Sequence, residues 1–565
     1  MQNSAMLVLK LAVLVCALTV QGCGGGGGGV TAVTAVTPAS TSPTPTGPNP
    51  VPATAATVLV TGTATYAFVP NKPSNGALDF AATVDKPVRG ATVQAMSGST
   101  VLASTVTNDQ GTYALTLPTN TAYFLRLRAE VINTSGPSKW NVSIKDNTAA
   151  GALWVVDSAV ASSGNANSSR SIAAGSGWNG SRYAATARAA GPFAILDTIY
   201  SGMKLVSSVQ PTATFPLLEV FWSPGNNTAR SANNDYSMGE IGVTFFLETI
   251  QGASVSRAIY VLGKEDDDTD EYDSSVVGHE FGHYLQSAFS NDHSTGGSHG
   301  SLSKLDMTLA FSEGWGTAWS SMMRGTPIYS DSLGLAQANG FTYSLATIPA
   351  DLARGWYRED SIHSGLYALY ADQGFLPIWN ALSGPMASSQ NALGSIFSFA
   401  AAVRSAGNAA VTSALDRIFA AQNIFTGVGA DQWGSGETNN GGNSGNLPIY
   451  TTLAFNTPTP VCFINDNLVG TSKNKLGMLK YFRASLAPGQ AGVRTITANF
   501  RIGRDLDFTV YQGRKVVLEA VADSLGSTSE SASVSLNAGE VVIRVSDFIT
   551  TSPPTAPGCA TITIR

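Results

Sequence analysis

Apolar and polar residues alternate along two long regions of the chain, residues 58–157 and residues 447–565. In both regions the alternating segments are short and are separated by glycine, proline, asparagine and aspartate, which is the pattern of half-buried strands joined by turns. TYALTLP and AYFLRLRAEV are examples from the first region, and TITANFRI and KVVLEAVA from the second. We therefore predict one β-sandwich in each region.

The region between them, residues 158–440, has a different pattern. Pro192 begins the run PFAILDTIYSGMKLV, which has helical spacing and carries proline in its favoured first turn. Two short apolar strands follow at residues 215–222 and 257–263, and helical stretches continue after them. We expect an α+β domain here, so the predicted fold class is a multidomain chain with an α+β domain flanked by two β-sandwiches.

The N-terminal residues have the composition of an export signal followed by a tether. Residues 1–22 hold one lysine and a long apolar run, and residues 23–57 are rich in glycine, threonine and proline, which form spacers rather than a core. The segment Val20-Gln21-Gly22-Cys23 resembles the lipobox of bacterial lipoproteins. That resemblance implies that Cys23 is lipidated and anchors the protein to a membrane of the bacterial cell envelope. The alternatives are an ordinary secretory signal, which gives a secreted protein, and an N-terminal membrane helix.

Composition and charge disfavour one class of partner. Charged residues make up 12% of the chain, which is about half of the usual fraction in soluble domains. The net charge is −6, so the chain has no basic field with which to attract nucleic acid.

Two of the four cysteines, Cys462 and Cys559, lie in the C-terminal β region. An exported protein meets an oxidising compartment, where such a pair can be oxidised. We expect these two residues to form a disulfide that closes the C-terminal domain.

The segment VVGHEFGHYLQ places His279 and His283 four residues apart, with Glu280 after the first. Apolar residues surround the motif with helical spacing, and Asp273 or Ser274 can cap the helix. The two imidazoles then lie one turn apart on one face, where they can bind a single Zn²⁺. Glu280 would lie beside the water bound by the metal, which is the place of the general base in zinc peptidases.

A catalytic zinc ion needs a third protein ligand and one open position. The pattern H-E-x-x-H-x-x-G-x-x-H does not apply, because the chain has Gln286 and Phe289 at the positions of its glycine and third histidine. His293 lies too far along the chain to share the geometry of the helix. We therefore predict that the third ligand is Glu313, in the segment LAFSEGWGTAW, which has the pattern of a second helix.

Together, the segments H-E-F-G-H and S-E-G-W-G resemble the gluzincin peptidases, in which a glutamate from a downstream helix completes the zinc site. The resemblance implies one catalytic Zn²⁺ on His279, His283 and Glu313, a zincin-like fold for residues 158–440, and protein or peptide substrates. Two features depart from the family. Twenty-nine residues separate His283 from Glu313, more than in the best-known gluzincins, and Thr317 stands where thermolysin-like enzymes have an aspartate.

All five histidines of the chain fall within residues 279–363. Gluzincins use a donor beyond the glutamate ligand, usually histidine or tyrosine, to stabilise the oxyanion of the tetrahedral intermediate. His363 has the right place in the chain and is our candidate for this catalytic role, with Tyr343 and Tyr357 as competitors. We expect His293 and His299 to be surface or core residues, although the glycine-rich loop around His299 could approach the metal.

The acidic segment KEDDDTDEYD precedes the zinc motif. Calcium takes six to eight oxygen ligands, so the carboxylates of residues 265–273 are candidates for a Ca²⁺ site. The segment lacks the D-x-D-x-D-G pattern of a calcium loop, and the favoured interpretation is a solvated loop that leads into the helix. The strand at residues 257–263 is the candidate edge strand for an extended substrate.

The two β regions resemble known modules. In the first, residues 90–93 and residues 107–113, in which an Asp-x-Gly turn precedes an aromatic strand, resemble the carboxypeptidase regulatory-like domain. In the second, residues 481–482, 506–511 and 536–540 resemble the bacterial pre-peptidase C-terminal domain. Both resemblances imply a β-sandwich, and neither implies a reaction.

The sequence therefore predicts a surface-anchored, monomeric zinc metallopeptidase that hydrolyses peptide bonds with a metal-activated water. The alternative is a lipoprotein adhesin, or a glycan- or protein-binding surface protein, in which the same scaffold has no turnover. No P-loop or C-x-x-C pair is present to support another chemistry.

Overall fold

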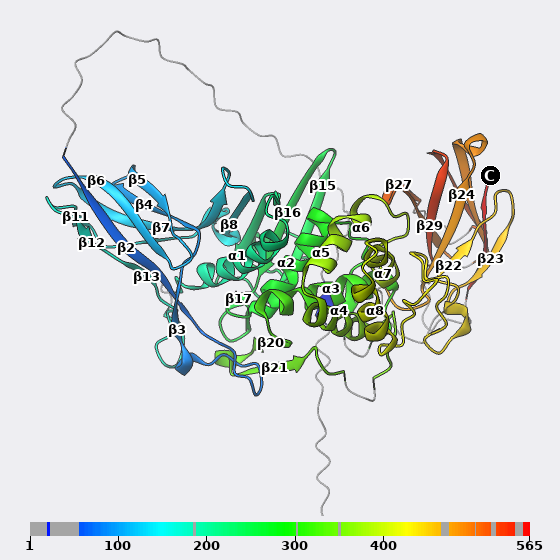
Figure 1. The fold of residues 1–565 in the computed structure, drawn as a ribbon, viewed down its shortest axis with the longest axis horizontal. Coiled ribbons are helices and arrows are strands. Elements are labelled where there is room, and N and C mark those ends of the chain that lie inside the picture. Colours follow the sequence, from blue (N-terminus) through cyan, green and yellow to red (C-terminus); the bar gives the residue numbers. More distant parts are fainter. Residues whose placement is uncertain are drawn as a thin grey trace, which may run out of the picture.

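The computed structural model places two β-rich parts on either side of a helical centre (Figure 1). The predicted export signal up to residue 19, the lipidation residue Cys23 and the tether up to residue 55 lie outside the residues that it describes. Within those residues, β1 (Val20–Gly22) pairs antiparallel with β19 (Gly297–His299). The structure describes residues 20–22, 56–184, 188–300, 303–348, 352–464, 474–502, 504–520, 527–547 and 558–565.

The N-terminal part contains a five-stranded sheet built around the long strand β2 (Thr57–Phe68). Exposed and buried residues alternate along β6 (Thr112–Pro118), which is the pattern predicted for the segment TYALTLP. This part is β-sandwich-like, because a second sheet covers the buried face of the first. The partners of β2 are β3 (Val84–Pro87), β6 (Thr112–Pro118), β12 (Ser168–Ser169) and β13 (Ile172–Ala174).

The second sheet crosses the domain boundary that we expected at residue 157. It has ten strands, and its main path runs in the order β15-β16-β14-β8-β7-β4-β5. β8 (Trp140–Asp146), from the N-terminal region, pairs in parallel with β14 (Leu218–Trp222) from the central region, and one hydrophobic core spans both. The other strands are β4 (Ala91–Ser97), β5 (Thr100–Val106), β7 (Ala122–Asn133), β9 (Ala152–Leu153), β10 (Val155–Asp157), β11 (Ala161–Ser162), β15 (Phe245–Gln251) and β16 (Ser254–Val261).

β16 is an interior strand of this sheet. It pairs in parallel with β14 on one side and antiparallel with β15 on the other. The prediction that residues 257–263 offer a free edge to a substrate is therefore wrong, and β15 forms the edge instead. The reason is a local hairpin: Gly252 adopts a left-handed backbone conformation, with φ of 60°, that folds β15 back onto β16.

Eight α-helices lie in the described residues of the central part. α1 begins with proline in its first turn, as the sequence predicted, and both helices expected around the histidine motif and Glu313 are present. None of the described helices is long and apolar enough to cross a membrane. The helices are α1 (Gly191–Val209), α2 (Ser274–Phe289), α3 (Met307–Arg324), α4 (Glu359–Gln373), α5 (Leu376–Ser383), α6 (Pro385–Ser388), α7 (Ile396–Ser405) and α8 (Ala409–Ala420).

A small sheet lies beside α2 and α3 in the order β17-β18-β20-β21. It joins the acidic segment that precedes α2 to residues that follow α3, because β18 pairs antiparallel with β20. Its strands are β17 (Gly263–Lys264), β18 (Asp268–Thr269), β20 (Ile328–Leu333) and β21 (Asn339–Ser344).

The C-terminal part consists of two antiparallel-rich sheets with a hydrophobic core of their own. One sheet has the order β22-β24-β29-β26-β27 and the other the order β23-β30-β25-β28. The strands are β22 (Tyr450–Thr452), β23 (Thr459–Cys462), β24 (Leu479–Leu486), β25 (Gly492–Phe500), β26 (Leu506–Gln512), β27 (Lys515–Ala520), β28 (Ser529–Leu536), β29 (Gly539–Asp547) and β30 (Cys559–Ile564).

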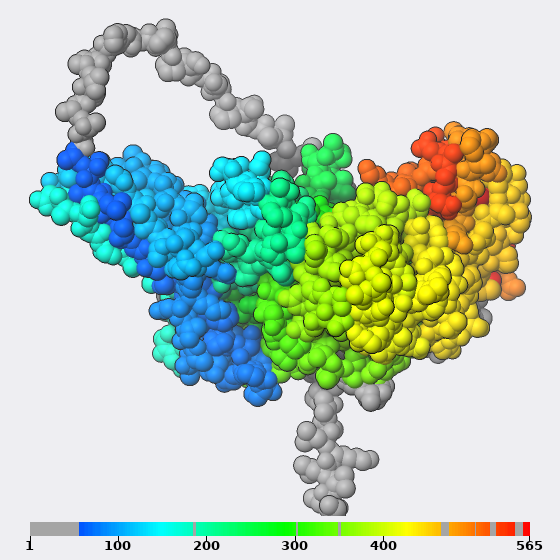
Figure 2. Space-filling model, in the orientation of Figure 1, coloured from blue at the N-terminus to red at the C-terminus, as the bar shows by residue number. Residues whose placement is uncertain are grey.

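Hydrogen bonds and packing hold this sandwich against the central part, and the space-filling view shows one continuous body (Figure 2). The hydroxyl of Tyr481 on β24 donates to the carboxylate of Asp306, which caps α3, at 2.8 Å. His293 also belongs to this contact. Its Nε2 lies 3.1 Å from the carbonyl oxygen of Arg514 in the β26–β27 turn, and its Nδ1 accepts from the backbone of Gly394.

Cys462 and Cys559 are paired in register on β23 and β30 and form a disulfide. The bond closes a separation of 97 residues, so it removes much conformational freedom from the unfolded chain. Replacing both cysteines by serine should lower the stability of the C-terminal sandwich by about 2–5 kcal/mol. Because the sandwich has its own core, calorimetry should show that its unfolding transition occurs at a lower temperature in the variant than in the native protein. Equal transitions in the variant and the native protein would contradict this expectation.

Candidate metal site

α2 carries two histidines on one buried face. Val277, Phe281 and Leu285 anchor the opposite side of the helix in the central core. His279 and His283 therefore point away from that anchor toward α3, at 9% and 2% exposure. His279 is the more exposed of the two.

α3 supplies the third side chain and lies close to α2. Asp306 caps its first turn by accepting from the backbone N–H of Thr308 at 2.9 Å. Glycine at two facing positions allows the close approach: a Cβ at Gly282 would lie 2.9 Å from the Cα of Gly316, and a Cβ at Gly316 would lie 3.0 Å from the ring of His279. The carboxylate of Glu313 is thereby brought to the two imidazoles.

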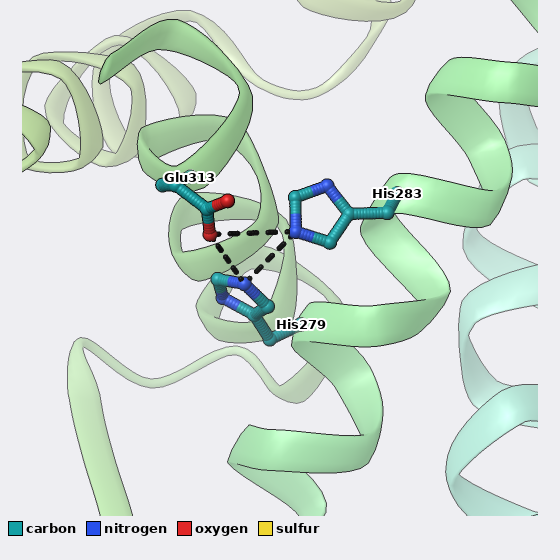
Figure 3. A group of neighbouring side chains, drawn as sticks. All are labelled: His279, His283 and Glu313. Atoms are coloured by element: carbon teal, nitrogen blue, oxygen red, sulfur yellow. Dashed lines mark hydrogen bonds and ion pairs between the residues drawn. The ribbon is translucent and has the colours of Figure 1, made fainter. Parts of the chain in front are cut away.

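The three side chains converge on one point (Figure 3). Glu313 Oε2 lies 3.1 Å from His279 Nε2 and 3.5 Å from His283 Nε2, and the two ring nitrogens are 3.0 Å apart. Among the residues that the structure describes, they form one of two groups of possible metal ligands whose donor atoms lie within 4.8 Å of one another, and the one that contains histidine. The convergence that the sequence predicted is present in the structure.

Hydrogen bonds from the far side of each ring fix the orientation of both imidazoles. His279 Nδ1 lies 3.0 Å from the hydroxyl of Thr317, and His283 Nδ1 lies 3.2 Å from the hydroxyl of Ser312. Ser312 in turn is 3.2 Å from the carboxylate of Asp292. With the Nδ1 atoms occupied, both Nε2 atoms face the common point, which is the usual arrangement of histidine ligands.

His299 joins this group, although the sequence favoured a surface or core role for it. Its Nε2 lies 3.4 Å from Glu313 Oε2, and its Nδ1 lies 2.8 Å from Glu359 Oε2 at the start of α4. In the sequence, the feature that indicated this contact was the glycine-rich loop around His299, which lets β19 reach α3. Residues 296–300 also match the pattern G-x-S-x-G, but they lie around strand β19 and not at a strand-to-helix turn.

Charge pairing inside this buried site shifts several pKa values. Burial alone would lower the pKa of His283 and His299, but Glu313 outweighs that effect and the pKa of each rises to about 9. Burial would raise the pKa of Glu313, but the neighbouring histidines hold it well below its usual range. The carboxylate is therefore ionised at neutral pH and can serve as a ligand.

Glu280 lies next to the histidine pair on α2 and is 4% exposed. Its Oε2 accepts from the backbone N–H of Phe246, at 2.9 Å, on the edge strand β15. This bond joins the candidate general base to the edge of the large sheet. The sequence could not show it, because the two residues are 34 positions apart.

His363 is buried on α4 and stacks on the ring of Tyr343, with 5.8 Å between ring centroids. Burial lowers the pKa of His363 to about 4, so the ring is neutral at pH 7. Tyr343 makes a side-chain hydrogen bond with Thr317, next to the histidine pair. Tyr357 instead bonds to the backbone of Arg354, which leaves His363 and Tyr343 as the candidate donors.

The acidic segment before α2 is exposed or half-buried up to Asp268 but buried from Thr269 onward, so the prediction of a solvated loop is wrong for its second half. Asp270, Glu271 and Asp273 are each at most 3% exposed. Asp273 precedes α2 but does not cap it, because its carboxylate accepts from Asn71 and from Ser332 on β20. The prediction from acidic composition failed there because β20, about 60 residues later, pairs with this segment.

No protein-family model and no curated protein matches the chain. Three of the similar solved structures each match about a fifth of it. The pre-peptidase C-terminal domain of a collagenase from Bacillus anthracis is 10% identical, with a TM-score of 0.16, over 20% of this chain and 94% of that one. A surface-associated copper-binding protein of Methylomicrobium album is 9% identical, with a TM-score of 0.17, over 21% and 98%. A periplasmic lysozyme inhibitor of Aeromonas hydrophila is 12% identical, with a TM-score of 0.13, over 20% and 97%.

Proposed function

We propose that the chain is a zinc-dependent metallopeptidase of the gluzincin type, with a zincin-like central domain. The observation that carries this proposal is the convergence of His279 Nε2, His283 Nε2 and Glu313 Oε2 beside Glu280. Two imidazoles and one carboxylate are the donor set of catalytic zinc sites that keep one position open.

The residues present fit a zinc ion. Within the described parts of the chain, Glu313 Oε1 is buried and has no hydrogen-bond partner, although it belongs to an ionised carboxylate. Such a group is costly unless a cation balances it. The hydrogen bonds of Thr317 and Ser312 to the Nδ1 atoms also leave both Nε2 atoms as the ligand atoms.

The side chains of this site have separate roles in the proposed reaction. Zinc bound here would lower the pKa of a water molecule and polarise the peptide carbonyl. Glu280, held in place by Phe246, accepts a proton from the attacking water and donates it to the leaving amine. His363 or Tyr343 donates a hydrogen bond to the oxygen of the tetrahedral intermediate.

In this proposal, the lipidation site and the tether at the N-terminus support a role outside the cell. A lipid at Cys23 would anchor the monomeric protein to the membrane, and the Thr- and Pro-rich tether would hold the enzyme away from it. Substrates would then be proteins or peptides at the surface of the cell.

Metal analysis combined with a protease assay tests the proposal. The purified protein should contain about one equivalent of zinc and should hydrolyse casein. A chelator should remove the activity, and added zinc should restore it. Bound zinc without hydrolysis of casein or of a peptide library would instead favour the adhesin or binding-protein alternative on the same scaffold.

A further inference from the structure

The carboxylates of the acidic segment before α2 differ in how they are paired. Five of them have partners, although Glu271 Oε2 stays unpartnered beside the ion pair that Glu271 makes with Arg188 through its other oxygen. The remaining two, Asp268 and Asp270, each keep a buried oxygen, Oδ1, without a hydrogen-bond partner in the described structure. Asp270 uses its other oxygen to accept from the hydroxyl of Thr244. The five paired acids are Glu265 with Tyr183, Asp266 with Ala336, Asp267 with Thr228, Glu271 with Arg188, and Asp273 with Asn71 and Ser332.

A third carboxylate reaches the same place from another part of the chain. Asp331 lies on β20, the strand that pairs with β18, and its Oδ1 is likewise buried without a partner among the described residues. One carboxylate oxygen from each of Asp268, Asp270 and Asp331 lies within 4.8 Å of the other two. Asp270 is only 3% exposed, so its unpartnered oxygen is turned into a buried cluster and not toward solvent.

Three carboxylates at this distance repel one another unless a cation lies between them. Burial and then the neighbouring acids raise the pKa of Asp268 and of Asp331 well above the usual range. The largest charge effects on Asp268 all come from other aspartates, which are Asp270, Asp331, Asp273 and Asp267. Placing such groups together without a counter-charge is unfavourable.

We propose that Asp268, Asp270 and Asp331 bind a calcium ion. The donor atoms are all carboxylate oxygens, which hard cations prefer, whereas zinc prefers nitrogen and sulfur. Calcium tolerates irregular geometry and several carboxylates, while magnesium dehydrates reluctantly and is seldom held by a site made only of protein groups. The site therefore differs in chemistry from the histidine site and does not depend on it.

The position of this site gives the ion a consequence for the proposed reaction, and this step rests on the proposed function. The carboxylate of Asp270 accepts a hydrogen bond from the hydroxyl of Thr244. Phe246, two residues after Thr244, donates from its backbone N–H to the carboxylate of Glu280. A cation bound by Asp270 thus fixes the short segment that holds the general base. Calcium acts here as a positioning ion for Glu280 and takes no part in the chemistry.

Calcium titration of the purified full-length protein tests the site itself. After treatment with EGTA, calorimetry should show about one Ca²⁺ bound per chain, and calcium should raise the unfolding temperature by several degrees. Asp268→Asn and Asp331→Asn should weaken calcium binding at least about tenfold and remove most of that rise. Both variants should fold, because each removes one of the repelling charges.

Two controls separate this site from its surroundings. The first control is Asp267→Asn, which removes one negative charge from the same loop. The side chain of Asp267 bonds to Thr228 and is not one of the three proposed ligands, so this variant should bind calcium like the native protein. His279→Ala removes a ligand of the histidine site and should also keep calcium binding, so failure of the zinc proposal would leave this result unchanged. The proposal is overturned if the native protein shows no calcium response, if Asp331→Asn responds like the native protein, or if magnesium binds more tightly than calcium.

Discussion

Glu280→Gln should reduce peptide hydrolysis by a factor of about 10²–10⁴ or more while zinc stays bound. Glutamine has nearly the same shape and keeps an oxygen that can accept from the backbone of Phe246, so the fold of α2 and the edge of β15 should not change. The amide cannot take up a proton from the attacking water. The loss should therefore appear in kcat, with little change in zinc content.

Steady-state kinetics on casein-derived peptides and zinc analysis of the same samples measure this effect. Glu240→Gln is a matched control, because Glu240 is exposed and lies outside the site. It should keep the activity of the native protein. Hydrolysis at the native rate by Glu280→Gln would show that this glutamate is not the general base, and loss of zinc from it would show a structural defect.

Glu313→Gln should weaken zinc binding by more than about 100-fold and thereby abolish activity. The loss of a group that only hydrogen-bonds to a metal ligand already lowers metal affinity or activity by about 10–100-fold, and Glu313 is the proposed ligand itself. The carboxylate is the proposed anionic ligand, and its Oε2 lies 3.1, 3.5 and 3.4 Å from the Nε2 atoms of His279, His283 and His299. Thr317→Val keeps all three ligands but removes the hydrogen bonds of the Thr317 hydroxyl to His279 Nδ1 and to Tyr343, so it should show an intermediate loss of about 10–100-fold.

Zinc binding should also depend on pH in a way that tests this charge pairing. Because Glu313 raises the pKa of His283 to about 9, a proton competes with zinc for that imidazole below pH 9. Zinc affinity of the native protein should therefore rise as the pH increases toward 9. In Glu313→Gln that rise should end at a lower pH, because the histidine has lost its anionic partner. Competition titrations with a zinc indicator at several pH values measure both effects, and an unchanged pH profile in the variant would contradict the assignment.

The sequence by itself determined the elements that local patterns encode. The spacing of apolar residues predicted α2 and α3, and the alternation in residues 447–565 predicted strands that the structure contains. The spacing of four residues between His279 and His283 placed both rings on one face, because an α-helix repeats every 3.6 residues. These features depend on neighbours in the chain, so periodicity and residue type suffice to predict them.

Only the tertiary structure decided which distant residues meet. It put β15 at the edge of the large sheet in place of residues 257–263, and it joined two regions in one sheet across residue 157. It brought His299 and Glu359 to Glu313, and Asp331 to the acidic segment. A local pattern records whether a residue is buried, but not the group that it is buried against. Contacts between strands and helices that lie tens of residues apart are set by the packing of the whole domain.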